Sequence, residues 1–175
     1  MVQEAVENIG KAAQDAMSSI HTAIPGTINA VDLGTGLATV TPIGMFATPS
    51  GQKIKFPVVT GVPLVIPQCP ALGIEIAFPV KAGDSCLIIF SEQELDGWLY
   101  GKESEGTLRF DLTSAIAIPG LGKTAGAAFK EACGSGSVVI ANGTTKFTVS
   151  KSGIAMSGNL KVDGNISYTG SLSGG

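Results

Sequence analysis

The sequence predicts a mainly β fold that begins with one α-helix and ends in a short β-repetitive segment. Three patterns of apolar residues support this prediction. They follow a helical spacing before Pro25, they alternate in short runs over residues 27–119, and they recur every six residues after residue 153. The changes of pattern divide the chain into a helix at 1–21, a β domain at 22–121, a linker with a short helix at 122–136, and a terminal β-helical segment at 137–175.

The composition indicates that other chains cover part of the surface. Hydrophobic residues make up 44% of the 175 positions and charged residues only 14%, against about 25% charged in an average globular protein. One small domain cannot bury so much apolar surface, which favours an obligate oligomer. A membrane helix is excluded because prolines and glycines interrupt the longest uncharged stretches, 33–52 and 56–74. The net charge of −3 argues against a nucleic-acid partner.

Residues 2–21 are expected to form an amphipathic helix that ends before Pro25-Gly26. Its apolar residues are separated alternately by four and three positions, like the a and d positions of a coiled coil. They are Val2, Val6, Ile9, Ala13, Ala16 and Ile20. This seam packs either on its own domain or on another chain. The length of the helix favours another chain, so these residues are the candidate docking contact.

Short alternating runs separated by turn residues predict antiparallel strands between residues 27 and 119. The runs are TINAVD (27–32), LATVTP (37–42), IKFPVV (54–59), GIEIAFPV (73–80) and SCLIIF (85–90), and LRFDL and SAIAIP together close the region (108–119). SCLIIF is almost wholly apolar, which predicts a central strand buried on both faces. About five strands in this length favour a small closed barrel of the OB type over a sandwich, which uses about seven.

The last part of the chain combines a hairpin signal with a repeat. A short helix is expected at 123–133 and a hinge at 134–136, and Asn142-Gly143 predicts a tight β-turn between two alternating runs. Glycine then closes successive units of six residues at Gly158, Gly164 and Gly170. Apolar residues occupy two positions of each unit: Ile154, Leu160, Ile166 and Leu172 at the first, and Met156, Val162 and Tyr168 at the second.

These seven residues share one face of an extended chain because they are an even number of positions apart. That face is too narrow to be buried within one chain, and the repeat has too few units for a single-chain β-helix. We therefore expect three copies to wind around a threefold axis as a β-helix or β-prism, with the seven residues at the trimer interface.

No catalytic, cofactor or metal site is expected. His21 is the only histidine, so every His-dependent catalytic group or metal cluster would depend on it. Cys69, Cys86 and Cys133 form no CxxC pair, and we interpret them as reduced structural thiols. No basic segment precedes an apolar one at the start, so no secretory signal is expected.

The run AIPGLGKT (117–124) is similar to a phosphate-binding loop. Pro119 removes one N–H group from this loop, and no βαβ unit surrounds it, so we interpret the run as an ordinary turn that leaves the domain. The acids of FSEQELDGW are interpreted as a solvated turn rather than a catalytic carboxylate pair. They are Glu92, Glu94 and Asp96.

Three blocks of the chain occur in the order found in a known protein family. They are TAIPGTINAVD (22–32), FPVKAGDSCLIIFSEQELDGWL (78–99) and RFDLTSAIAIPGL (109–121). Through them, residues 22–121 resemble the N-terminal OB-fold domain of the central spike proteins of contractile phage tails and related injection machines. The resemblance implies an OB-fold domain that continues into a trimeric β-helix. It also implies a homotrimer that plugs the tail hub, leads penetration of the target cell envelope and belongs to the baseplate of a particle assembled in the bacterial cytoplasm.

The chain departs from this family at its end. Members often hold a metal at the apex through a His-X-His motif, whereas no histidine follows His21 here. The resemblance therefore does not extend to a metal-tipped apex, and a separate tip protein or a blunt end is expected. The alternative function is an OB-fold binding module for oligosaccharide or single-stranded nucleic acid, which sparse aromatic and basic residues disfavour. A trimeric hexapeptide-repeat acyltransferase lacks the coils and the catalytic histidine.

Overall fold

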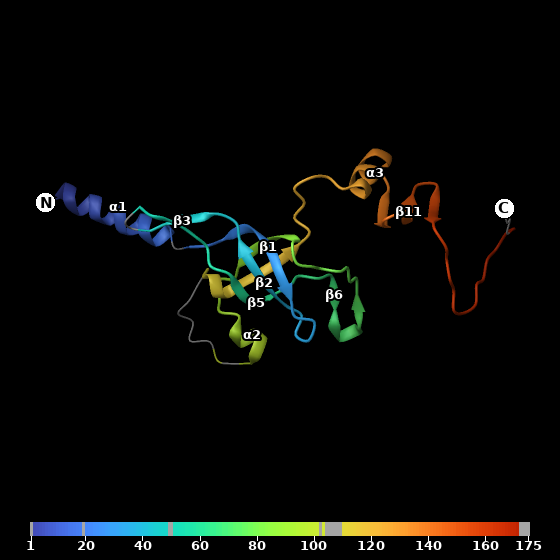
Figure 1. Ribbon diagram of the computed structural model, residues 1–175, viewed down its shortest axis with the longest axis horizontal. Helices are drawn as coiled ribbons and strands as arrows, with labels where there is room; N and C mark the ends of the chain where they lie inside the picture. The colour runs from blue at the N-terminus through green and yellow to red at the C-terminus, as the bar shows by residue number, and fades with distance from the viewer. Residues whose placement is uncertain (1, 19, 49–50, 102, 104–109, 172–175) are drawn as a thin grey trace. The chain divides into compact units, whose positions relative to one another are not determined.

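The computed structural model describes residues 2–18, 20–48, 51–101, 103 and 110–171 (Figure 1). Contacts within the chain divide it into two compact units, Met1–Leu121 and Gly122–Gly175. Leu172, one of the seven residues expected at a trimer interface, lies outside the described residues. In the part of the chain that is described, no helix is long and apolar enough to span a membrane.

The first unit begins with helix α1, Val2–Ser18. The expected helix reached residue 21, so the observed one ends earlier. The reason lies in the backbone of His21, whose N–H donates to the carbonyl oxygen of Phe110 at 3.1 Å. This bond ties His21 to the barrel instead of to the preceding helical turn.

A curled sheet follows, and its described strands are β1 (Ala23–Val31), β2 (Leu37–Pro42), β5 (Val59–Pro63), β8 (Ser85–Phe90) and β9 (Ala115–Pro119). Their order is β5-β2-β1-β8-β9, and all neighbours are antiparallel. The two outer strands approach each other just past β5, where Leu64 forms a parallel bridge with Ala117 and the Val65 N–H donates to the Ala117 oxygen at 2.9 Å. The sheet therefore curls back on itself into an OB-like, partly open barrel.

The core of this unit lies inside the curled sheet. Its buried apolar residues are Ile28, Ala38, Val40, Val59, Val62, Cys86, Ile88, Phe90, Ala115 and Ala117. Strand β8 lies between β1 and β9, as expected for a central strand. The expectation that it is buried on both faces is wrong, because Leu87 and Ile89 on the outer face are only half-buried. A single curled layer has a dry interior and no second layer to cover its outer face.

Short elements decorate the barrel. They are the hairpin β3–β4 (Met45–Ala47 and Lys53–Lys55), the hairpin β6–β7 (Gln68–Cys69 and Ile74–Glu75) with the 3₁₀ turn η1 (Pro70–Leu72) at its tip, helix α2 (Asp96–Tyr100) and the 3₁₀ turn η2 (Leu112–Ser114). Two expected strands are therefore shorter than their sequence runs. Pro57 lies between β4 and β5, and the run 73–80 is a strand only at Ile74–Glu75. In the expected run LRFDL (108–112), the described residues 110–112 contain no strand.

The second unit contains helix α3 (Ala127–Ser135) and the strands β10 (Val138–Asn142), β11 (Thr145–Ser150) and β12 (Gly153–Ser157). The strands form an antiparallel sheet in chain order. The expected tight turn forms, but one residue later than Asn142-Gly143: Asn142 pairs with Thr145, so Gly143, with a φ of 62°, and Thr144 are the two loop residues. Gly136 caps the C-terminal end of helix α3, and its N–H donates to the Ala132 oxygen.

The expected strands of the six-residue repeat form only in part. Beyond β12, the described residues 158–171 contain no strand. A strand needs a neighbouring strand for its backbone hydrogen bonds, and the β12 edge is the last one within the chain. The repeat glycines nevertheless adopt the left-handed backbone expected of corners, with φ of 119°, 155° and 128° at Gly158, Gly164 and Gly170.

Candidate interaction surface

The strand register of the second unit places six large apolar side chains on one face of its described sheet. Directly paired residues in an antiparallel sheet point to the same side, as do residues two positions apart. One row runs Val138–Val149–Ile154 and the other runs Ile140–Phe147–Met156. We call these six residues the apolar sheet face.

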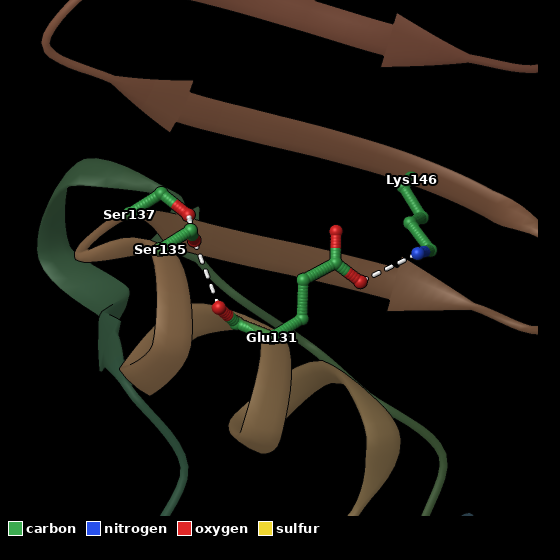
Figure 2. A network of polar contacts seen from close by, with 4 residues as sticks. All are labelled: Glu131, Ser135, Ser137 and Lys146. Carbon is green, nitrogen blue, oxygen red and sulfur yellow. Dashed lines mark hydrogen bonds and ion pairs between the residues drawn. The ribbon is translucent and has the colours of Figure 1, made fainter.

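Helix α3 packs against β10 on the opposite side of the same sheet. Lys146 is next to Phe147 in β11 and therefore points to the other side, where its Nζ donates to Glu131 Oε2 of α3 at 2.5 Å (Figure 2). At the end of the helix, the Ser135 hydroxyl donates to the Glu131 carbonyl oxygen at 2.8 Å and contacts the Ser137 hydroxyl. These polar contacts fix the helix to the Lys146 side, so α3 leaves the apolar sheet face uncovered.

The apolar sheet face is open in the single chain. Val138, Ile140 and Ile154 are 61%, 65% and 66% exposed, whereas Val139, which points toward the α3 side, is half-buried. Residues 122–171 are described throughout, and none of them is buried. The second unit therefore has an exposed apolar face and no buried residue, which makes this face a candidate contact surface.

The apolar surface continues beyond the sheet. In the six-residue repeat, Leu160, Val162, Ile166 and Tyr168 are all at least 42% exposed. Of the predicted interface residues, the structure brings Ile154 and Met156 together on the apolar sheet face, and it places these four on the segment that follows β12.

Sequence reasoning missed four members of the apolar sheet face: Val138, Ile140, Phe147 and Val149. A signal for them was present. A two-residue turn centred on Asn142-Gly143 would pair residue 141 with residue 144, which already places Val138, Ile140, Phe147 and Val149 on one face. The observed pair of Asn142 with Thr145 keeps them on that face and sets Ile140 opposite Phe147 and Val138 opposite Val149.

Helix α1 carries a second open apolar surface. Val6 and Ile9 of the predicted seam are 63% and 70% exposed, and Ala13 is also exposed. The expectation that Ile20 lies on this helix is wrong, because α1 ends at Ser18; Ile20 is 49% exposed beyond that end. The side chains of Val2 and Ala16 lie outside the described set. Among the α1 side chains that are described, none belongs to the barrel core. The seam is therefore available for a partner.

The residues with reactive side chains are dispersed. Among the described residues, no group of three or more His, Cys, Asp or Glu side chains is placed to hold a metal ion. The His21 ring packs against Phe56 and Phe90, with both centroid separations 5.5 Å. Burial raises the pKa of the Cys86 thiol, which disfavours its reactive thiolate form. Cys69 and Cys133 are exposed free thiols.

The run that is similar to a phosphate-binding loop does not have the structure of one. Ala115–Pro119 forms β9, paired along its length with β8, and α3 begins only at Ala127. Lys123 lies exposed between these two elements. A phosphate-binding loop instead leads directly from a strand into a helix N-terminus.

Comparison with known proteins agrees with the barrel architecture. No curated protein matches the chain. A family model described as the phage protein Gp138 N-terminal domain matches residues 24–120. The match begins at the second residue of β1 and ends just after β9, so it covers the whole barrel and more than half of the chain. The chain therefore belongs to the family of phage proteins that contain the Gp138 N-terminal domain.

Proposed function

We propose that three copies of this chain form the central spike of a contractile tail baseplate, which plugs the hub and leads penetration of the target cell envelope. Membership of a phage protein domain family supports a structural role in the virion. The observation that carries the proposal is the apolar sheet face. This surface is exposed, and no described residue of the second unit is buried.

The repeat geometry favours three copies. A β-helix uses roughly three six-residue units for each coil. One unit from each of three chains completes the same coil, and the left-handed corners at Gly158, Gly164 and Gly170 provide bends at the required spacing. Each apolar residue then meets its two symmetry mates on the axis, which covers the apolar sheet face and pairs the open strand edges.

The function proposed is mechanical, and the protein is not an enzyme. Contraction of a sheath drives the tube forward with the spike at its front, and strand ladders shared among three chains resist unfolding under that load. The α1 seam is the proposed contact with the baseplate hub, because its described residues are exposed and separate from the barrel core.

Electron cryomicroscopy of tails tests this function. Tails assembled with the native chain are expected to show threefold density on the tail axis below the hub. Tails assembled with a chain that lacks residues 137–175 are expected to lose the distal part of this density and to fail in envelope penetration, although tube and sheath assemble. Absence of axial density in the native tails, or full penetration by the truncated ones, would contradict the proposal.

A further inference from the structure

A groove lined by apolar side chains opens beside the described β1–β2 turn of the barrel. Its volume is about 480 Å³. One wall comes from Leu64 and Ile66, which follow β5, and the other from Phe78 and Val80, which precede β8. Lys81 is the only charged residue among the described lining residues. The groove therefore suits an apolar segment that carries one negative charge.

Along the sequence, the segment between the lining residues Ile66 and Phe78 forms an arm, residues 67–77, that contains the β6–β7 hairpin. It lies to one side of the curled sheet (Figure 1), and its hairpin is held by the pairs Gln68–Glu75 and Cys69–Ile74. Leu72, Ile74 and Ile76 of the arm are 76%, 58% and 68% exposed. Both ends of the arm continue directly into residues that line the groove of the same chain. The arm therefore cannot fold back into that groove without displacing these lining residues.

The arm carries one charged residue, Glu75, between Ile74 and Ile76. Both Glu75 and Lys81 are exposed, and neither forms an ion pair within the described part of the chain. The arm thus matches the groove in apolar character and is opposite to it in charge. Both partners exist on the same chain, so every added copy supplies one arm and one groove.

We propose that the arm of each copy lies in the groove of the next copy, with Glu75 paired to Lys81. This inference rests on the proposed trimer. A head-to-tail contact of this kind closes into a ring when the rotation between copies completes a circle, and a ring of three uses each arm and each groove once. The barrels then form a closed collar, which also covers Leu33, a groove-lining residue 93% exposed in the single chain.

A charge exchange tests the pair. Glu75→Lys and Lys81→Glu each place like charges together and are expected to raise the dissociation constant of the trimer at least tenfold in sedimentation experiments at low salt. The double variant restores the pair with reversed polarity and is expected to return within threefold of the native value. Lys53→Glu, an exposed charge change in β4, is the control and is expected to have no effect. Unaffected single variants, or a double variant no better than the singles, would overturn the proposal.

Disulfide formation tests the geometry. The variant carries Glu75→Cys and Lys81→Cys together with Cys69→Ser and Cys133→Ser, which remove the exposed native thiols. Oxidation is expected to yield a covalent trimer on a non-reducing denaturing gel. Bridges confined to single chains would overturn the inference.

The two proposals fail differently. If the native chain is trimeric but neither the charge exchange nor the disulfide experiment gives the expected result, the arm inference is wrong and the proposed trimer stands. If Glu75→Lys leaves the trimer intact but abolishes hub binding, the arm contacts the hub protein and the arm inference is also wrong. A monomeric native chain would overturn both proposals.

Discussion

Replacing Ile140 with aspartate tests the apolar sheet face directly. Ile140 lies in the row that it forms with Phe147 and Met156, and 65% of it is exposed in the single chain. In the proposed trimer, three copies of this side chain are covered. The substitution therefore places three carboxylates in an apolar contact, while the single chain loses nothing from its own core.

The expected magnitude follows from the area covered. Full burial of an isoleucine side chain stabilises by about 1.5–3 kcal/mol, so covering the exposed two-thirds contributes about 1–2 kcal/mol per chain and about 3–6 kcal/mol per trimer. Ile140→Ala removes most of this, which corresponds to about two to four orders of magnitude in the dissociation constant. Ile140→Asp costs more, because each buried carboxylate adds a desolvation penalty of several kcal/mol.

The assay is sedimentation velocity over a range of concentrations, together with circular dichroism to follow the barrel. Ala141→Asp is the matched control, because Ala141 is exposed and points to the Lys146 side of the same strand. We expect Ile140→Asp to be monomeric with an intact barrel and Ala141→Asp to keep the native assembly. If both variants assemble like the native chain, the apolar sheet face is not an interface.

Further predictions concern the first unit. Gly26→Ala is expected to destabilise the barrel by about 1–3 kcal/mol in urea unfolding, because an added Cβ would lie 2.4 Å from Ile88 Cδ1, whereas Gly10→Ala has no atom within 4 Å and should not destabilise. Deleting residues 1–21 should leave a folded trimer that binds the hub weakly, and an unfolded product would contradict this. The pKa of Asp32 is lowered from 3.8 by the Gly34 N–H and then by the Thr35 hydroxyl. The ionised Asp32 carboxylate therefore stabilises the β1–β2 turn above pH 3.8. This stabilisation is lost as the pH falls through the lowered pKa that Asp32 has in the folded chain. The stability difference between native chain and Asp32→Ala should accordingly vanish in acid, and a difference that grows in acid would refute this.

Alternation and turn residues predicted the strands that have partners within the chain. The runs 37–42 and 85–90 coincide with β2 and β8. Strand β1 begins earlier than its predicted run, because Ala23 and Ile24 pair with Ile89 and Ile88 of β8. Pro25-Gly26 was interpreted as a boundary, yet both residues lie inside β1. Gly26 is required there by its close packing against Ile88, which no local pattern reveals.

Alternation alone overestimated the strands that lack a partner. The run 73–80 and the repeat after residue 158 both alternate, but the described residues there are strand only at Ile74–Glu75. A side-chain pattern shows which face of a strand is apolar and does not show which edge will pair with it. The same limit explains why the repeat pointed to only two members of the apolar sheet face. They are Ile154 and Met156, whereas the hairpin residues beside them required the strand register.

The mass of the 175-residue chain in solution tests the central claim most directly. The claim is that three copies cover the apolar sheet face and the repeat that follows it. Light scattering coupled to gel filtration is expected to give three times the mass of one chain for the native protein, and a smaller assembly for a chain that lacks residues 137–175. A native mass equal to one chain would contradict the account.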